Sequence, residues 1–469
     1  MVEVAFCLGH ARTTPFTSRP EEPAMPHHVE APESLVTSAP VARLAILLPA
    51  FLLAAFAVLA VGCADADRGE AVGPDASSGV SSELAAVAHG GAPESLDPRM
   101  VAEGRRIFRF DDFGDSRFWT DTMRLNELVE QVSPNTALAL GLKVDVEAIP
   151  PEVLEAVLAN PELLDDPAIT RALLELDAVL GLRAEIEGER IARIGTTCAL
   201  CHSSVDDTGS PLPGVGQRRD GWANTDLAVG TILSLTPGLP VLAEALGVDP
   251  GTLAEEFASW PPGFFDPRVN LDGRLDDPPV VIPPAYGLRG VGLETFTAEG
   301  PVSYWNQYVA VTQMRGVGSF RDPRLGVAIR VPPHEDRVRG KLPALRQYQL
   351  SLAAPEPPAG FFDPEAAERG RAIFEGDAGC ASCHVGPNLT DGGNLHDPSE
   401  TGMEPTWAER GTTGGYRTTP LRALWQHAPY FHDGSAETLD DVVEHYDGVL
   451  ALGLTEGEKA DLVEYLKSL

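Results

Sequence analysis

Two short stretches, Cys198-Ala-Leu-Cys201-His202 and Cys380-Ala-Ser-Cys383-His384, decide the fold of this 469-residue chain. In each stretch two cysteines stand three positions apart and a histidine follows directly, which is the attachment pattern of a c-type haem. Two thiols one helical turn apart reach the two vinyl groups on one porphyrin edge, and the adjacent histidine ligates the iron through Nε2. The sequence therefore predicts two covalently bound c-type haems as cofactors.

Two other uses of paired cysteines fit the sequence less well. Zinc ribbons also carry two CxxC pairs, but those pairs lie about 15–20 residues apart, whereas Cys201 and Cys380 belong to different halves of the chain. A thioredoxin-like redox pair needs no histidine directly after it, and here His202 and His384 follow both pairs.

Charge and composition exclude other classes of protein. The chain has 35 basic and 69 acidic residues, a net charge of −34, which disfavours binding to nucleic acid or to an anionic membrane surface. Hydrophobic residues make up 43 % of the chain, as expected of a globular protein. The length predicts two or three domains with ample material for a buried core.

The N-terminus carries an apolar segment, residues 44–61, with Cys63 directly beyond its end. We interpret residues 1–62 as a signal sequence, after which a lipidated Cys63 and a flexible tether, residues 63–97, would follow. A plain cleaved signal or an uncleaved anchor are the alternatives. Because the region before the apolar segment is long and acidic, translation starting at Met25 is a further alternative. Each interpretation predicts an exported protein, and lipidation of Cys63 would hold it on the periplasmic face of a bacterial membrane.

A proline-rich segment, residues 353–360, divides the rest of the chain into two domains. We expect a first cytochrome c-like domain over 98–352 and a second cytochrome c domain over 361–469. Thr455 and Glu458 form a capping box that predicts the closing helix of the second domain. The fold class expected is mainly α, with two haem domains joined by long loops.

An internal repeat supports this division. Residues 368–374 (ERGRAIF) stand shortly before Cys380, as the first helix of a cytochrome c domain should. Residues 103–108 (EGRRIF) read much the same, yet Cys198 follows only much later. We therefore expect an insertion over about 109–195, with helical stretches at 151–158 and 161–180.

Each ligating histidine needs its other ring nitrogen held, because the ring would otherwise turn and the wrong tautomer would form. After His384, residues 385–389 (VGPNL) resemble the Gly-Pro-x-Leu turn of small c-type cytochromes, and this resemblance implies the carbonyl of Pro387 as the acceptor for Nδ1–H. After His202, the matching candidate is Pro213.

The block from Thr419 to Leu439 (TPLR…APYFHDGS…TL) resembles the C-terminal signature of the bacterial di-haem cytochrome c peroxidase and MauG family. The resemblance is specific over residues 361–469 and loose over 98–352. It implies an oxidoreductase in which one haem collects electrons from a small redox protein and the other activates peroxide or oxygen. A homodimer is common in that family.

The resemblance also implies ligands on the far side of the irons. Tyr446 stands where the peroxidases have a methionine ligand and where MauG has a tyrosine ligand, so it is the candidate for the second haem. The internal repeat, not the resemblance, gives Met314 the comparable place for the first haem, because it stands twenty-six residues after Leu288 as Tyr446 stands twenty-five after Leu421. Met403 is the fallback for the second haem. His432 falls in the second haem pocket and is the candidate catalytic residue. The family's peroxidatic glutamate has no positional match, and Glu294 is only a guess for it.

Two functions remain open from sequence. An enzyme of this family needs one iron with an open position, whereas a pure electron carrier has both irons six-coordinate. Binding of Tyr446 and Met314 to their irons would favour the carrier.

Overall fold

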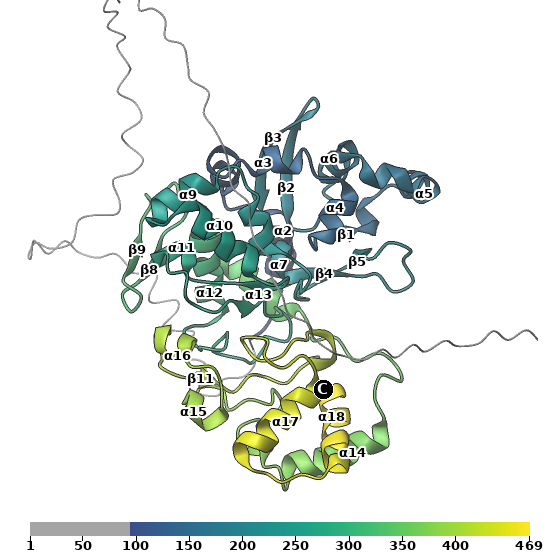
Figure 1. Ribbon diagram of the computed structural model, residues 1–469, viewed down its shortest axis with the longest axis vertical. Helices are drawn as coiled ribbons and strands as arrows, with labels where there is room; N and C mark the ends of the chain where they lie inside the picture. The colour runs from purple at the N-terminus through teal and green to yellow at the C-terminus, as the bar shows by residue number, and fades with distance from the viewer. Residues whose placement is uncertain (1–93) are drawn as a thin grey trace, which may run out of the picture. The chain divides into compact units, whose positions relative to one another are not determined.

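Helices form most of the regular structure in the computed structural model, which describes residues 94–469 (Figure 1). The expected mainly α fold is thereby confirmed. The predicted signal, the lipidated Cys63 and nearly all of the tether lie outside the described residues. Among the helices of residues 94–469, none has the length and apolarity required to cross a membrane. We call residues 98–352 the N-terminal lobe and residues 361–469 the C-terminal lobe.

Each lobe contains a pair of packed helices that brings its two ends together. In the N-terminal lobe, α2 (Pro98–Phe110) packs against α13 (Leu342–Ser351). In the C-terminal lobe, α14 (Pro364–Glu375) packs against α18 (Glu456–Lys467), as Figure 1 shows. The expected capping box starts α18: Thr455 accepts a hydrogen bond from the Glu458 backbone, and the Glu458 side chain accepts one in return.

A glycine lets the two helices of each pair approach closely. A Cβ on Gly104 of α2 would lie 1.9 Å from the carbonyl oxygen of Ala344, and one on Gly370 of α14 would lie 1.9 Å from that of Asp461. Both glycines occupy the same place in the repeated segment, so the repeat includes the contact between the helices as well as the sequence.

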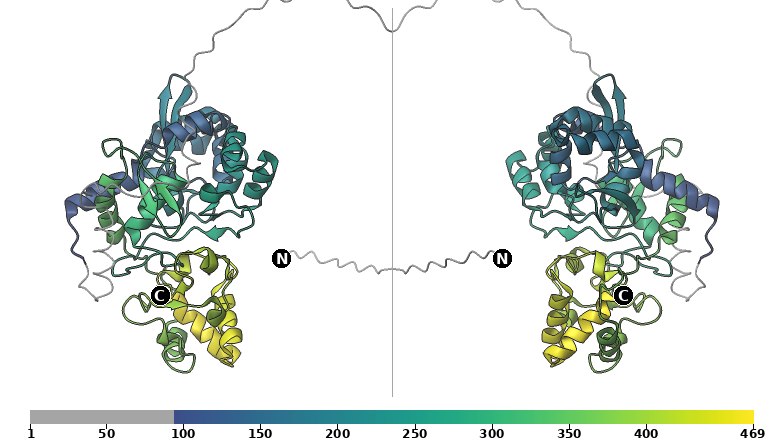
Figure 2. Two further views of the ribbon diagram at one scale, coloured as in Figure 1. Left: turned by 90° about the vertical axis from the view of Figure 1, so that its left-hand side faces the viewer. Right: turned by 90° about the vertical axis from the view of Figure 1, so that its right-hand side faces the viewer.

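The segment between α2 and the first CxxCH motif holds short helices and one hairpin. Helix α5 (Pro151–Ala159) matches the expected helix, but the expected helix at 161–180 is a 3₁₀ turn, η3 (Pro161–Asp165), and a helix, α6 (Pro167–Glu175). Strands β2 (Leu182–Glu187) and β3 (Arg190–Thr196) form an antiparallel hairpin that projects from the neighbouring helices (Figures 1 and 2). The other elements here are η1 (Phe118–Thr122), α3 (Leu125–Val129), α4 (Pro134–Ala139), β1 (Val144–Asp145) and η2 (Val146–Ala148).

After the first motif, β4 (Ser203–Asp206) and β5 (Val215–Asp220) pair antiparallel, and β1 joins β5 to give a three-stranded sheet. The remaining elements of the lobe are α8 (Val229–Ser234), α9 (Leu239–Leu246), α10 (Pro250–Ser259), β6 (Phe264–Phe265), α11 (Val269–Asp272), β7 (Val280–Val281), α12 (Val302–Tyr308), the π-helical turn η4 (Val309–Gln313), β8 (Phe320–Asp322), β9 (Val327–Ile329) and η5 (Arg339–Lys341).

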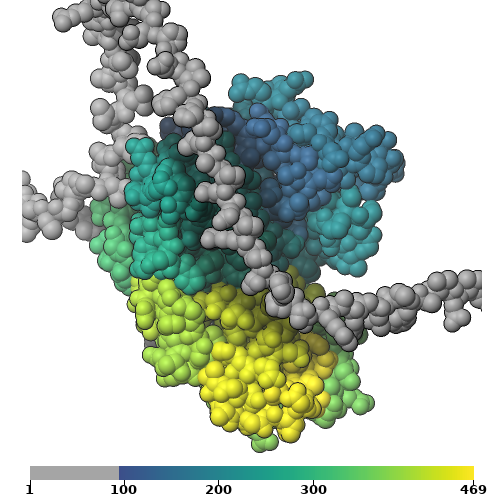
Figure 3. Space-filling model, viewed as in Figure 1, coloured from purple at the N-terminus to yellow at the C-terminus, as the bar shows by residue number. Residues whose placement is uncertain are grey.

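The C-terminal lobe has few strands. Its further elements are η6 (Cys380–Ser382), β10 (Leu395–His396), α15 (Pro398–Thr401), α16 (Thr406–Arg410), β11 (Tyr416–Arg417), η7 (Leu424–Gln426) and α17 (Leu439–Leu450). Strands β10 and β11 pair antiparallel. In the space-filling view its surface meets that of the N-terminal lobe directly (Figure 3).

The cores position both motifs. Cys198 packs against one core of the N-terminal lobe, which includes Phe108 and Tyr308, and Cys201 packs against another, which includes Leu174 and Ile194. Cys380 packs against the core between α14, α17 and α18. Three of the four motif thiols therefore lie at the edges of buried apolar clusters.

Candidate haem-attachment sites

The first motif forms a single helical turn, α7 (Ala199–His202), with Cys198 at its N-cap. Burial raises the pKa of both thiols, Cys198 and Cys201, to about 12, so they are neutral at physiological pH. The four cysteines of residues 94–469 are free thiols. The pair is thus available for attachment to a haem.

The ring of His202 is oriented by a distant carbonyl: Nδ1–H donates to the oxygen of Pro283 at 3.0 Å. The prediction of Pro213 was wrong. Strand β4 begins at Ser203, directly after the histidine, so the chain leaves the site at once and carries Pro213 away on the loop between β4 and β5. Two backbone hydrogen bonds, from Gly221 to the His202 carbonyl and from Ala285 to the Gly221 carbonyl, hold the Pro283 segment in place.

The second motif lies in η6 and the turn after it. Nδ1–H of His384 donates to the carbonyl of Leu389 at 2.9 Å, so the prediction of Pro387 was wrong by two residues. The turn closes through a hydrogen bond from the Leu389 amide to the Gly386 carbonyl, and Leu389 itself has a φ of 47°. This left-handed conformation directs the Leu389 carbonyl back towards the imidazole.

A second backbone segment borders His384, and it repeats the arrangement around His202. The backbone of Thr419 lies close enough to His384 to act on its pKa. Thr419 precedes Pro420 as Pro283 precedes Pro284, so the two lobes place equivalent backbone beside their histidines. Burial lowers the pKa of both histidines, which favours the neutral imidazole that ligates iron.

These arrangements fit a covalently attached haem. Each motif offers two free thiols, at least one of them at the edge of an apolar core, and a neutral imidazole. Because Nδ1 of each ring is engaged by a carbonyl, Nε2 is the nitrogen left to bind iron.

Tyr446 lies beside the second motif. It sits on α17 and contacts Phe431 edge to face, with ring centroids 5.9 Å apart. Burial raises its pKa to about 12, and the nearby thiols of Cys380 and Cys383 add to the rise. The structure thus brings this predicted ligand close to the second pair of cysteines.

Met314 lies beside the first motif. It is 7 % exposed and belongs to the core against which Cys198 packs, at the end of the π-helical turn η4. Single π-helical turns inside helices are frequent at functional sites. Met403, the fallback ligand, packs against the core of Trp407 and Tyr416 and lines a cavity of about 510 Å³.

Two loops repeat one backbone conformation, one from each lobe. Residues 294–300 and residues 430–436 are each closed by an antiparallel bridge between their first and last residues. In both loops the second residue, Thr295 or Phe431, has a positive φ, 61° and 65° respectively. Counted from these loops, Met314 stands four residues farther along the chain than Tyr446, so the two candidate ligands are not equivalent in position.

The third residues of these loops, Phe296 and His432, stack on each other with centroids 4.8 Å apart and planes inclined by 21°. Reciprocal hydrogen bonds join the lobes here: the Val281 amide donates to the His432 carbonyl, and the Arg417 amide donates to the Phe296 carbonyl, both at 2.9 Å. Tyr416 contacts the other side of the cluster, 4.7 Å from the His432 ring. The two lobes therefore meet through equivalent segments.

His432, the candidate catalytic residue, is held in this stack. Its side chain is 3 % exposed, its Nε2 lies 3.9 Å from a carboxylate oxygen of Glu404, and that nitrogen has no hydrogen-bond partner among the described residues. Burial lowers the pKa of His432, so the ring is a neutral base.

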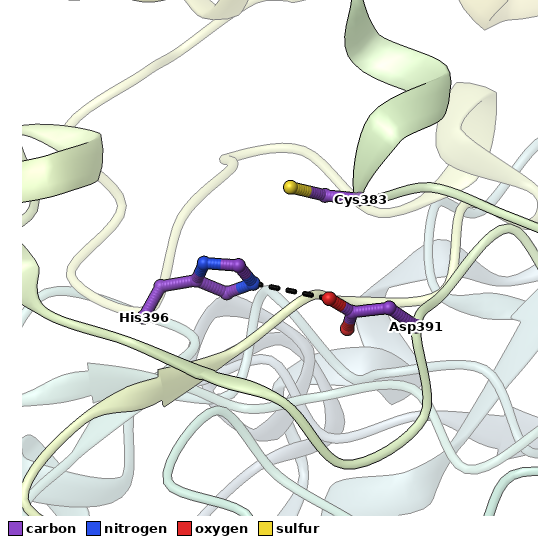
Figure 4. Close-up of side chains that lie close together, drawn as sticks. All are labelled: Cys383, Asp391 and His396. Atoms are coloured by element: carbon purple, nitrogen blue, oxygen red, sulfur yellow. Dashed lines mark hydrogen bonds and ion pairs between the residues drawn. The ribbon is translucent and has the colours of Figure 1, made fainter.

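Sequence reasoning missed a polar cluster at the second motif, where Cys383, Asp391 and His396 gather (Figure 4). His396 Nε2 lies 3.3 Å from the Asp391 carboxylate and 3.0 Å from the hydroxyl of Thr418. Because Cys383 belongs to the attachment motif, the cluster borders the second site. The sequence signal for this cluster was that Asp391 and His396 follow His384 closely in the chain.

No protein-family model matches the chain. Curated proteins similar to it include the cytochrome-c peroxidase IdrP1 of Denitromonas iodatirespirans, 32 % identical over 22 % of this chain and 40 % of that protein. The cytochrome-c peroxidase IdrP2 of Pseudomonas sp. is 25 % identical over 59 % of this chain and 76 % of its own length. The methylamine utilization protein MauG of Methylorubrum extorquens is 30 % identical over 27 % and 42 %. The chain is therefore similar to cytochrome c peroxidases and to MauG, at modest sequence identity. The chain spans less than half the length of the first and third of these relatives.

Proposed function

We propose that this chain is an exported di-haem c-type cytochrome of the peroxidase and MauG family, which acts as an oxidoreductase on peroxide or oxygen. The observation that carries the proposal is the pair of complete attachment sites, in each of which a carbonyl fixes Nδ1 of the histidine. The similarity to proteins named cytochrome-c peroxidase and MauG supports the choice of reaction class.

The chain's own residues have distinct roles in this proposal. Cys198, Cys201, Cys380 and Cys383 would hold the two haems, and His202 and His384 would ligate their irons. When bound, a haem with an open iron position supplies the reduction of peroxide or oxygen, and the other haem supplies electrons. His432, neutral and with an unpartnered Nε2, is proposed to accept and return protons.

Tyr446 is proposed as the sixth ligand of the second haem. The supporting observation is its burial next to Cys380 and Cys383. An anionic tyrosinate favours ferric iron over ferrous iron, so this haem would have a low potential. The phenol must lose its proton on binding, and the positive charge of the iron would offset the raised pKa.

The second candidate function is electron transfer without catalysis. It is favoured by the burial of Met314 beside the first motif, because a methionine bound there would close the first iron as well. Under either function we propose a small redox protein as partner, a lipid anchor at Cys63 on the periplasmic side of the membrane, and a homodimer as one assembly.

Low-temperature EPR of the haem-loaded protein, fully oxidised and one-electron reduced, tests the choice. The oxidoreductase predicts a high-spin ferric signal in at least one of these states, because an open iron is five-coordinate or binds water. Low-spin signals alone in both states would show two closed irons, and the chain would then be an electron carrier. A preparation without two haems per chain would refute both functions.

A further inference from the structure

A buried arginine of the C-terminal lobe reaches across to the N-terminal lobe. Arg417 lies on β11, and its side chain is 11 % exposed. One terminal nitrogen donates to the carbonyl of Leu293, and the other lies 3.5 Å from the carboxylate of Glu294. The guanidinium is thus held on one side by a backbone oxygen and on the other by a loosely placed carboxylate.

Positive charge exceeds negative charge in this place. Arg422, from the same lobe, donates to the carbonyl of Gly287. Glu294 is the one carboxylate of residues 94–469 whose charge acts on both guanidiniums. A buried and a half-buried cation share one counter-charge, so positive charge is left uncompensated, which a protein interior tolerates poorly.

One donor of Arg417 is also unused. Its Nε is buried and has no hydrogen-bond partner among the described residues. A buried N–H donor without an acceptor is costly, so the atom is expected to have a partner in the complete protein. Excess charge and a free donor at one guanidinium both call for an additional anion.

The strand places Arg417 near the second attachment site. Two residues farther along, the backbone of Thr419 borders His384. Between them lies Thr418. Its carbonyl accepts a hydrogen bond from the Thr390 hydroxyl at 2.7 Å, and the hydroxyl of Thr418 is hydrogen-bonded to His396. We therefore expect the additional anion beside Arg417 to be a carboxylate of the second haem.

We propose that Arg417, supported by Arg422, positions the second haem by binding one of its propionate carboxylates through Nε. Glu294 then serves as the protein's own counter-charge on the opposite side of the guanidinium. The inference rests on the second haem of the proposed function. It makes Arg417 a positioning residue, which acts on the iron through the haem carboxylate.

A fixed cation beside a haem favours the form of the iron with less positive charge, which is the reduced form. Loss of Arg417 should therefore lower the reduction potential of one haem, and loss of the negative charge of Glu294 should raise the potential of the same haem. The two substitutions give opposite signs, which a general disturbance of packing would not produce.

The experiment is a spectroelectrochemical titration of both haems in the haem-loaded protein, after haem content is measured. Arg417→Gln is expected to lower the potential of one haem by about 59 mV, a tenfold shift in the one-electron equilibrium. Arg417→Lys should keep most of the wild-type potential, and Glu294→Gln should move the same haem upwards. Arg371→Gln, at an exposed arginine of α14 that pairs with Glu368, is the matched control and should leave both potentials unchanged.

The outcomes separate the explanations. Unchanged potentials in Arg417→Gln and Glu294→Gln, with two haems bound, would overturn the role of Arg417 and leave the proposed function intact. If Arg417→Gln does not mature, the test rests on Arg417→Lys and Glu294→Gln. The same haem potentials in these two variants would then overturn the proposal, because Glu294→Gln is expected to raise the potential of one haem. Added acetate could change a haem potential of the wild-type protein and leave that of Arg417→Lys unchanged. This result would show that a free carboxylate binds Arg417 in place of a haem propionate, and it would also overturn the proposal. Loss of haem from the second motif in the wild-type protein would refute the proposed function as well.

Discussion

Replacing Gly370 by alanine should open the helix pair that carries the second attachment site. The new Cβ would lie 1.9 Å from the carbonyl oxygen of Asp461, and this obstacle is backbone that cannot rotate away. To reach 3.4 Å, where ordinary contacts begin, α14 and α18 must separate locally by about 1.5 Å. Phe374 and Leu462, which are buried between them, would then lose contacts.

The free energy follows from two opposing terms. Overpacking of this kind costs about 1–3 kcal/mol, and the better helix propensity of alanine returns up to about 1 kcal/mol. We therefore expect a loss of about 1–2 kcal/mol in the free energy of unfolding, measured by urea unfolding of the haem-loaded protein with far-UV circular dichroism. Gly448→Ala on α17 is the control, because a Cβ there meets nothing within 4 Å, and it should be neutral or stabilising. A Gly370→Ala protein as stable as the Gly448→Ala protein would refute the reasoning.

Four further results are expected. Tyr446→Phe should give the second haem a high-spin ferric EPR signal in the oxidised protein, and an unaltered low-spin spectrum would exclude the phenol as ligand. Replacing Cys198 and Cys201 together by alanine should lower the haem content from two per chain to one, as measured by the pyridine haemochrome assay; retention of two covalent haems would contradict the assignment. Glu294 has a pKa raised by burial to about 7, so its native state binds more protons than its unfolded state between pH 4.5 and 7, and stability should fall by up to about 3 kcal/mol as pH rises through that window. Glu294→Gln should lack this slope in urea unfolding measured across pH, and an equal slope would assign it to other groups. His432→Phe keeps the aromatic stack but removes the ring nitrogens, so peroxide turnover should fall about 100-fold or more at unchanged stability, whereas full turnover would make the ring purely structural.

Several helices could be predicted from sequence because their signals are local. The capping box of Thr455 and Glu458 fixed the start of α18, and the repeat of residues 103–108 and 368–374 located α2 and α14. The hairpin of β2 and β3 also had a local signal, since apolar and polar residues alternate on both sides of Gly188, which has a φ of 64°. That alternation indicates strands rather than the helical insertion expected there.

The hydrogen-bond partners of His202 and His384 could not be predicted in the same way. Nδ1–H of His202 is satisfied by the backbone carbonyl of Pro283, and any residue can supply a carbonyl. No side chain therefore marks the acceptor, and the pairing depends on where the intervening chain runs. Arg417 shows the same limit, because its missing partner is evident only once its burial and its neighbours across the lobes are known.

The reciprocal hydrogen bonds at Val281 and Arg417 give the contact between the lobes an approximate two-fold symmetry. When residue i of one lobe bonds residue j of the other, and j of the first bonds i of the second, the contact has the geometry of a two-fold homodimer. In a homodimer both subunits have the same sequence, so every substitution at such a contact occurs on both sides. A ring that stacks on the same residue of the partner subunit is therefore always replaced together with that residue. Within one chain each side can be substituted alone. In this chain the two equivalent positions hold different rings: Phe296 is inert and His432 is ionisable.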